Sequence, residues 1–168
     1  MKRGLFEDLH EDFRASFRTF LEREVAPGYA DWEREGIVPR EVFAKAGAGG
    51  FLAMSVPEPF GGAGAEDFRL NLVIGEECQR AGVGSFGLGI TLHNDICLPY
   101  FLSYASEEHR ERWLGGIVSG ELITAIAMTE PGIGSDLAGM SSSARREGEH
   151  YLVNGAKTFI TNGINADL

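Results

Sequence analysis

Cysteine is scarce in this sequence, with two copies in 168 residues. Cys78 and Cys97 lie far apart, form no C-x-x-C pair and have no pair of histidines nearby, so their spacing gives little support to a zinc site or a redox pair. We expect both to be small core residues, because free cysteine is among the most buried residue types. No metal site is expected, and nothing in the sequence calls for an oxidising compartment.

Long apolar runs are also absent. No stretch of about eighteen apolar residues occurs, which argues against a membrane span. The start MKRGLFEDLHEDFR turns acidic at once and contains no secretory apolar segment, so no signal peptide is expected. A cytoplasmic location fits these features, as does the mitochondrial matrix if the source is eukaryotic and a transit peptide has been removed.

Basic side chains are in the minority. The sequence has 15 Lys and Arg against 25 Asp and Glu, which gives a formal charge of −10. The basic residues do not cluster along the sequence. Such a chain would repel a phosphate backbone, so no nucleic-acid partner is expected. With 43% hydrophobic and 24% charged residues, the composition is ordinary for a soluble globular protein, and the length allows a core without disulfides or metals.

Helical periodicity dominates residues 1–120. From Leu5 to Val25 the apolar positions recur at steps of three and four, which is typical of an amphipathic helix. Pro27 and Gly28 are expected to end that helix. Further helices are expected over 39–45, 66–80 and 107–118, the last capped by Ser106, with an ordered loop over 54–65.

The segment 86–104 differs from the other helical segments because it is apolar nearly all round. This is typical of a helix surrounded by other helices, and we expect it to be kinked or broken at Pro99. His93, Asn94 and Asp95 within it suggest either a catalytic role or a hydrogen-bonded core histidine, and the second is commoner. The remaining histidines lie in polar settings and are expected to be solvated: His10, His109 and His150.

The pattern then changes to that of strands. ELITAIAM (121–128) is an apolar run, HYLVNG (150–155) alternates, and KTFIT (157–161) is β-branched and aromatic. We therefore expect a mainly α protein with β: an amino-terminal helical domain over 1–120 and the incomplete start of a β-domain over 121–168. Strands without partners would expose a long edge, which suggests a fragment, a disordered remainder or a partner chain that completes the sheet.

The bend AIAMTEPGIGSDLAG, residues 125–139, follows the first expected strand. Gly132 and Gly134 can take positive φ, so that successive N–H groups point into one concavity and bind an anion such as pyrophosphate. Hydroxyls at Thr129 and Ser135 add donors. On the residues alone an ordinary Pro-Gly turn is commoner. The bend matches neither a Walker A loop nor the dinucleotide fingerprint, so phosphate binding would be of another kind.

AIAMTEPGIGSDLAG resembles the first signature of the acyl-CoA dehydrogenase family, and NGAKTFITNG (154–163) resembles the strand that follows it there. Upstream, WEREGIVPREVFAKAG (32–47) and VPEPFGGAG (56–64) have family counterparts in the same order, so the match covers essentially the whole chain. Within that family, the sequence of these motifs most resembles the long-chain acyl-CoA dehydrogenases. The resemblance implies a helical bundle, the first strands of a β-barrel-like middle domain, and a carboxy-terminal helical domain that is missing here.

The resemblance also implies FAD as cofactor. It places Met128 and Thr129 along the isoalloxazine, and Ser135 at both the pyrophosphate and the acyl-CoA thioester arm. Phe159 would pack on the flavin where many relatives carry tryptophan, and Thr161 would hydrogen-bond near N5, the hydride acceptor. The full set of implied cofactor contacts is Ile126, Met128, Thr129, Gly134, Ser135, Phe159, Ile160 and Thr161.

The implied reaction is α,β-dehydrogenation of a fatty acyl-CoA to trans-2-enoyl-CoA, with electron-transfer flavoprotein as acceptor and a homotetramer as the usual assembly. The family's base is a glutamate of the carboxy-terminal domain, so no catalytic residue is expected in this chain. Glu130 is expected to have a structural part in its turn, with an arginine as candidate partner. Two alternatives stay open: a non-catalytic module that completes a partner subunit, and an acyl-CoA oxidase-like relative.

Overall fold

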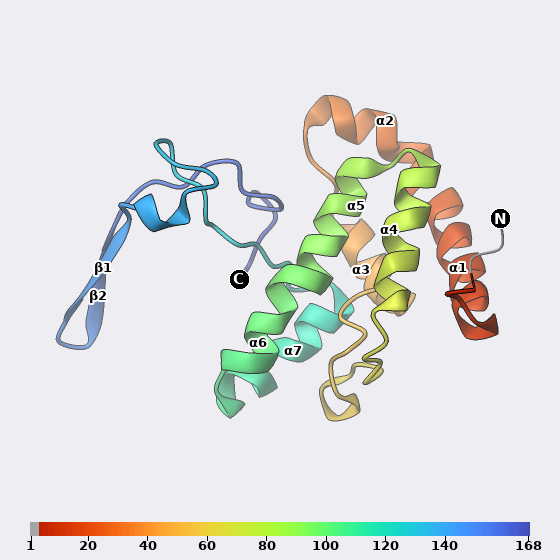
Figure 1. Ribbon diagram of the computed structural model, residues 1–168, viewed down its shortest axis with the longest axis horizontal. Helices are drawn as coiled ribbons and strands as arrows, with labels where there is room; N and C mark the ends of the chain where they lie inside the picture. Colours follow the sequence, from red (N-terminus) through yellow and green to blue (C-terminus); the bar gives the residue numbers. More distant parts are fainter. Residues whose placement is uncertain (1–3) are drawn as a thin grey trace.

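A helical body and a projecting arm make up the molecule (Figure 1). The structure is a computed structural model that describes residues 4–168. The arm leaves the body after α7, forms a hairpin, and returns so that the carboxyl end lies back against the body, where Leu168 packs on apolar side chains of the core. The helices of the body are α1 (Asp8–Phe20), α2 (Ala26–Glu35), α3 (Arg40–Ala48), α4 (Arg69–Ala81), α5 (Gly84–Thr91), α6 (Leu98–Tyr104) and α7 (Glu107–Ser119).

The first predicted helix forms but does not end at Pro27 and Gly28. α1 continues through a π-helical turn, Leu21–Val25, directly into α2, with Pro27 in the first turn of α2. A helix tolerates proline in its first turn, where the missing N–H breaks no bond, and the wider π turn brings Pro27 to that position. The predicted stop is therefore wrong, and the helix ends at Gly36, whose φ of 75° closes α2 in the left-handed conformation.

The buried helix predicted over 86–104 also continues beyond its proline, Pro99, by way of a π turn. α5 leads through π-helical Leu92–Cys97 into α6, and Pro99 lies in the first turn of α6. The helix does not break at Pro99, because the π turn again places the proline where no helical N–H is needed, and the kink named as the other outcome stays a prediction. His93 and Asn94 lie within this π turn and are buried.

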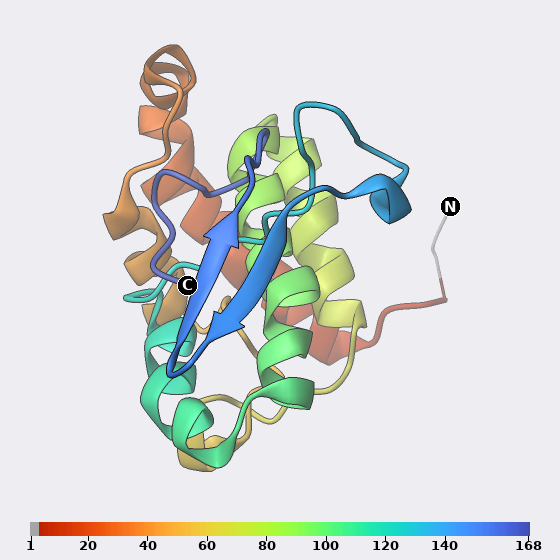
Figure 2. The same ribbon diagram turned by 90° about the vertical axis from the view of Figure 1, so that its left-hand side faces the viewer.

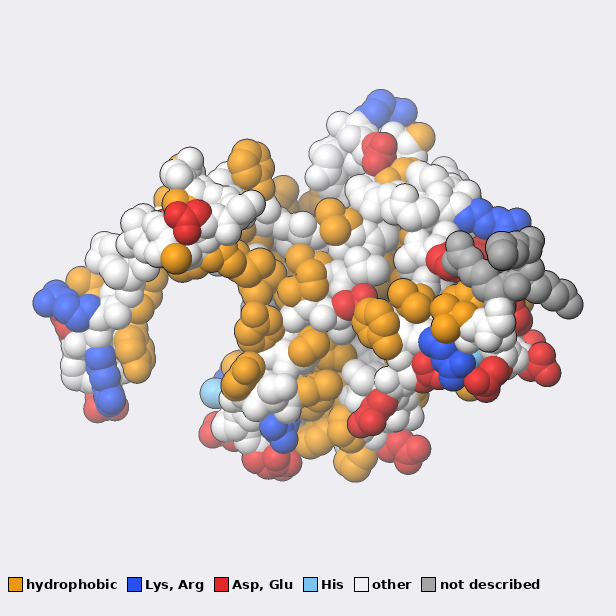
Figure 3. Space-filling model, viewed as in Figure 1, with side chains coloured by type: hydrophobic (Ala, Val, Ile, Leu, Met, Phe, Trp, Pro, Cys, Tyr) orange, Lys and Arg blue, Asp and Glu red, His pale blue; other side chains and the backbone are white. Residues whose placement is uncertain are grey.

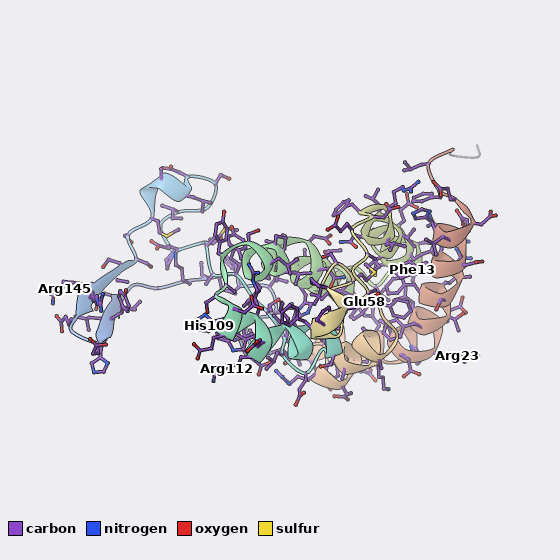
Figure 4. The ribbon with its side chains drawn as sticks, turned by 90° about the horizontal axis from the view of Figure 1, so that it is seen from below. Phe13, Arg23, Glu58, His109, Arg112 and Arg145 are labelled. Atoms are coloured by element: carbon purple, nitrogen blue, oxygen red, sulfur yellow. The ribbon has the colours of Figure 1, made fainter. Side chains whose placement is uncertain are left out.

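An aromatic cluster packs α1 and α5 around the loop that follows α3. The ring of Phe51 in that loop lies 4.9 Å from Phe17 and 5.6 Å from Phe13, both edge to face. Figure 4 shows Phe13 pointing from α1 towards the interior. Phe20 lies 6.2 Å from Phe86 on α5. Tilted aromatic pairs at these separations add stability beyond the apolar area they bury.

Both cysteines are core residues, as predicted. Cys78 lies on α4 and Cys97 in the π turn before α6, and each is buried with its thiol free. Burial raises the pKa of the Cys78 thiol to about 12. At neutral pH this thiol is therefore protonated and unreactive.

Helices α3 and α7 approach each other through glycine. A Cβ at Gly47 would lie 2.2 Å from the carbonyl oxygen of Ser119, and one at Gly120, whose φ is 74°, would lie 2.3 Å from the carbonyl oxygen of Phe43. α7 begins at its predicted cap, Ser106, whose side chain accepts a backbone N–H of the first turn at 3.3 Å. The close contact fixes the end of α7, from which the arm departs.

The arm carries one antiparallel hairpin, β1 (Ser143–Glu147) and β2 (His150–Asn154). Figure 2 shows this hairpin standing in front of the helices, with the carboxyl end beside it. The strand predicted at HYLVNG is confirmed as β2. Its partner β1 reads SARRE, whose polar composition carries no strand signal, and both strands are exposed along their length.

The strands predicted over 121–128 and 157–161 do not form. Both stretches lack a ladder, and the one backbone bond between this region and 157–161 in the described residues runs from the N–H of Thr158 to the carbonyl of Thr129 at 3.0 Å, one residue beyond the first stretch. A strand needs a neighbour along its whole length, and residues 4–168 offer none there. The division of the chain at residue 120 stays a prediction.

Candidate functional site

The bend at 125–139 closes through its backbone. Glu130 and Ile133 exchange two N–H to carbonyl bonds of 3.2 and 3.1 Å. Neither Gly132 nor Gly134 has positive φ, so that prediction is wrong: the reciprocal bonds close the turn without a left-handed residue. A Cβ at either glycine would meet no atom within 4 Å, which shows that both lie on open surface.

Two unpaired backbone donors lie next to each other in this bend. Within residues 4–168, no protein acceptor bonds the N–H of Gly134 or of Ser135. Both residues are exposed. Adjacent free N–H groups of this kind can bind an anionic ligand.

Glu130 is a buried carboxylate at the base of the bend, with 4% exposure. One oxygen accepts the N–H and the hydroxyl of Ser141 at 2.8 and 2.7 Å, and the other accepts the N–H of Ser142 and the ammonium of Lys157, both at 2.9 Å. Hydrogen bonds from Ser142, Ser141 and Lys157 hold the pKa of Glu130 well below its usual range. The geometry fits the structural part predicted for Glu130, with a lysine in place of the arginine.

The two predicted flavin-contacting segments converge at their ends. The ammonium of Lys157 also donates to the carbonyl of Met128 at 3.0 Å, and the N–H of Thr158 donates to the carbonyl of Thr129 at 3.0 Å. Residues 128–130 therefore lie beside residues 157–158. The structure brings the bend and the second segment together through bonds on three successive residues.

Phe159 projects from the second segment into solvent. Its side chain is 91% exposed and its backbone is left-handed, with φ of 55°. That conformation costs an ordinary L-residue about 1–2 kcal/mol. The exposed side chain buries little apolar surface that could offset this strain.

Ile160 and Thr161 face the helical body instead. They line a cavity of about 340 Å³ together with Trp32 of α2 and Leu88 of α5. The predicted cofactor residues of the bend do not line that cavity: Ile126, Met128, Thr129, Gly134 and Ser135. Of the eight predicted contacts, Ile160 and Thr161 line this cavity and the other six do not.

The arm curves over a hollow beside the helical body, and apolar side chains border the hollow on both sides (Figure 3). Figure 4 shows Arg145 on the hairpin separated across this space from His109 and Arg112 on α7. Exposed apolar patches mark interaction sites more often than single exposed apolar residues do. The exposed large apolar residues of the arm are Met128, Leu137, Met140, Tyr151, Leu152, Val153, Phe159 and Ile164.

His93 is the core histidine that the sequence predicted. It is fully buried, its Nε2 lies 3.0 Å from the carbonyl of Ile117, and its Nδ1 lies 2.9 Å from the hydroxyl of Thr124. Burial lowers the pKa of His93, so the ring is neutral at neutral pH. Both ring nitrogens of His93 therefore have hydrogen-bond partners within the fold.

His10 contradicts its prediction as a solvated residue. It is 1% exposed, because it lies on the inward face of α1, where its Nε2 is 3.1 Å from a carboxylate oxygen of Asp67. Its Nδ1 accepts the N–H of Glu7 at the start of the helix. The predictions for His109 and His150 are confirmed, since both are exposed.

The sequence alone did not point to Lys157. A signal was available, since Lys157 is the only Lys or Arg after Arg146 and a buried Glu130 needs a cation. In the part of the chain that the structure describes, no helix is long and apolar enough to cross a bilayer, and no three His, Cys, Asp or Glu side chains gather as metal ligands.

Two family models match the chain. "Acyl-CoA dehydrogenase, N-terminal domain" matches residues 7–121, and "Acyl-CoA dehydrogenase, middle domain" matches residues 125–168.

Individual proteins of known name are similar as well. The chain is 43% identical over 166 residues to the mitochondrial long-chain specific acyl-CoA dehydrogenase of Mus musculus, covering 99% of this chain and 38% of that relative. The acyl-CoA dehydrogenase structure from Geobacillus kaustophilus is 54% identical with a TM-score of 0.93, over 99% of this chain and 43% of that one. A Mycobacterium smegmatis glutaryl-CoA dehydrogenase in complex with FADH2 is 29% identical with a TM-score of 0.87, over 97% and 42%. The chain thus spans less than half the length of each.

Proposed function

Because the chain belongs to the acyl-CoA dehydrogenase family, we propose that it is the amino-terminal part of a FAD-dependent enzyme that oxidises fatty acyl-CoA thioesters to trans-2-enoyl-CoA. The observation that carries the proposal is the convergence of residues 128–130 with 157–158. It places free amide donors and an exposed, strained aromatic side chain on one arm. Those features suit a ligand that combines a diphosphate with a flat ring system.

The residues present fit FAD. The free N–H groups of Gly134 and Ser135 would receive the pyrophosphate, and the face of Phe159 would receive the isoalloxazine. Thr161 would present its hydroxyl near N5. The proposed contacts are the eight named from the sequence: Ile126, Met128, Thr129, Gly134, Ser135, Phe159, Ile160 and Thr161.

When bound, FAD supplies a two-electron acceptor for the hydride that leaves the β-carbon of the thioester. The chain's own part is to bind and orient, with Ser135 also serving the thioester arm of the substrate. Glu130 does not remove the α-proton, because four donors occupy its oxygens and its lowered pKa makes it a weak base. The base is proposed to lie in a part of the protein beyond residues 4–168.

Chain length, acceptor and assembly are further parts of the proposal. Identity to a relative named for long-chain substrates supports a long acyl chain. Electron-transfer flavoprotein as acceptor and a homotetramer are proposed from the family resemblance.

An absorbance scan of the purified native protein tests the proposal. Bound flavin, bleached on adding a fatty acyl-CoA under anaerobic conditions, is expected; a colourless protein that FAD cannot restore would refute the cofactor assignment. Intact mass distinguishes the enzyme from a module that ends at Leu168. Oxygen uptake on adding substrate would favour the oxidase-like alternative.

A matched pair of variants tests where the diphosphate lies. Ser135→Asp and Ser135→Asn have the same shape and differ in charge. We expect the Asp variant to bind FAD at least about fivefold more weakly than the Asn variant, because like charges about 4 Å apart at a protein surface repel by about 1–4 kcal/mol. Equal affinities in a flavin titration would place the diphosphate elsewhere.

A further inference from the structure

Arg40, the first residue of α3, reaches from the helical body to both legs of the arm. One guanidinium nitrogen donates to the carbonyl of Glu121 at 2.8 Å and to a carboxylate oxygen of Asp167 at 2.7 Å. Another donates to the carbonyl of Asn165. Glu121 opens the outgoing leg, and Asn165 and Asp167 belong to the returning leg.

Asp167 closes the base of the arm from the other side. The carboxylate oxygen that pairs with Arg40 also accepts the N–H of Ile123 at 2.9 Å, and the N–H of Asp167 donates to the carbonyl of Ile123 at 2.8 Å. The N–H of Ala125 adds a 2.9 Å bond to the carbonyl of Leu168. The pair Arg40–Asp167, which we call the clamp, therefore ties both legs to α3.

Hydrogen bonds of the returning leg connect the clamp to the proposed flavin-contacting segment 157–161. Asn162 follows Thr161 directly and accepts the N–H groups of Asn165 and Ala166 on its carbonyl at 2.8 and 2.9 Å. Its side-chain amide donates to the carbonyl of Gly89 on α5 at 3.0 Å. Thr161 lies inside a turn closed by the 2.9 Å bond from the N–H of Gly163 to the carbonyl of Ile160. Asn162 ties this turn to α5, and Asp167 of the clamp follows it in the chain.

We propose that Arg40 is a positioning residue: through Asp167 it sets how the segment 157–161 is presented to the helical body. The proposal rests on the proposed function, because it assigns this role towards a flavin. Arg40 contacts neither the bend 125–139 nor the segment 157–161, so it acts on them only through the base of the arm. Its removal would loosen both legs at once, which a residue that pairs within the body cannot do.

The test compares Arg40→Met with Lys45→Met in the native protein. Lys45 lies on the same helix and forms a matched ion pair with Glu24 at 2.7 Å, with exposures of 52% and 37% against 44% and 33% for the clamp. The Lys45 pair stays within the helical body. The first readout is hydrogen exchange of the apoprotein at Ala125, Ala166 and Asp167; the second is FAD affinity with visible circular dichroism of the bound flavin.

We expect Arg40→Met to speed exchange at these amides and to weaken FAD binding about tenfold, the effect of one lost hydrogen bond to a charged group, with a changed flavin dichroism. Arg40→Lys should restore part of each effect, and Lys45→Met should change neither readout. Unchanged exchange and unchanged flavin readouts in Arg40→Met would overturn the proposal. If Arg40→Met does not fold, Asp167→Asn decides in the same way.

The two proposals fail separately. A wild-type protein that binds no flavin refutes the proposed function, while exchange in the apoprotein still reports on the clamp. Faster exchange without any change in flavin affinity or dichroism would leave a structural clamp with no positioning role, and so would overturn the inference.

Discussion

The ammonium of Lys157 lies 2.9 Å from a carboxylate oxygen of Glu130 and 3.0 Å from the carbonyl of Met128. These contacts join two segments that are separated by a hairpin in the chain. Lys157 is therefore the one charged link, among residues 4–168, between the bend and the segment that carries Phe159.

Lys157→Met should separate the two segments. The change keeps the length of the side chain but leaves a buried carboxylate without its cation, so we expect faster exchange of the Thr158 amide and FAD affinity lower by about tenfold. Arg145→Met is the control, because Arg145 pairs with Glu147 on the exposed hairpin. Equal affinity in wild type and Lys157→Met would show that the link is dispensable.

Acid should loosen the bend before it unfolds the protein. The folded-state pKa of Glu130 is depressed, so the stability it contributes is present above its unfolded pKa of about 4.3 and is lost as pH falls below that value. We expect the protection factors of the Ser141 and Ser142 amides, which correct for the slower intrinsic exchange in acid, to fall below about pH 4.3 in wild type. Glu130→Gln should exchange fast at all pH values; a protected amide pair in that variant would contradict the assignment.

Much of the helical body was predictable because its apolar residues repeat with the helical period. Ser106 and the apolar segment 86–104 are examples, since each signal is local. The chain stays helical past both Pro27 and Pro99 for one reason: a π turn brings each proline to the start of a helix, and no local sequence pattern predicts a π turn.

The arm was harder to predict because its structure depends on distant partners. The composition of 121–128 and 157–161 favours β-strands, but composition cannot show whether a neighbouring strand is available to pair with them. The motif located the bend along the chain, and the flavin contact expected at Phe159 stays a prediction. It could not give the Lys157–Glu130 or Arg40–Asp167 pairs, which join residues far apart in sequence.

Phe159→Gly should change apo stability and flavin binding in opposite senses. Glycine relieves the left-handed strain, so the free energy of unfolding of the apoprotein should rise by about 1 kcal/mol. FAD binding should weaken roughly three- to tenfold, because an aromatic contact contributes about 0.5–1.5 kcal/mol. Tyr151→Gly, an exposed aromatic on β2, should only destabilise. Denaturant titration and flavin titration measure both, and a destabilised Phe159→Gly apoprotein would refute the strain argument.

Gly47→Ala and Gly75→Ala make the same change with opposite outcomes. At Gly47 the added methyl meets the end of α7, so we expect a loss of about 1–3 kcal/mol in unfolding free energy. At Gly75, in the interior of α4, the methyl meets no atom within 4 Å, and the higher helix propensity of alanine should stabilise by up to about 1 kcal/mol. Urea unfolding measures both. Equal effects would mean that α3 and α7 pack less closely than the structure indicates.

His93 should make stability depend on pH near neutrality. Burial lowers its folded-state pKa, so below the unfolded value of about 6.5 the unfolded chain binds a proton that the folded chain excludes. The stability is therefore present above about pH 6.5 and falls below it, by at most about 1.4 kcal/mol per pH unit. Urea unfolding at about pH 7.5 and about pH 5.5 should show this loss in wild type and in His109→Gln, whose histidine is exposed, but not in His93→Gln. The same loss in His93→Gln would assign the pH dependence to other groups and show that the buried ring can be protonated without cost.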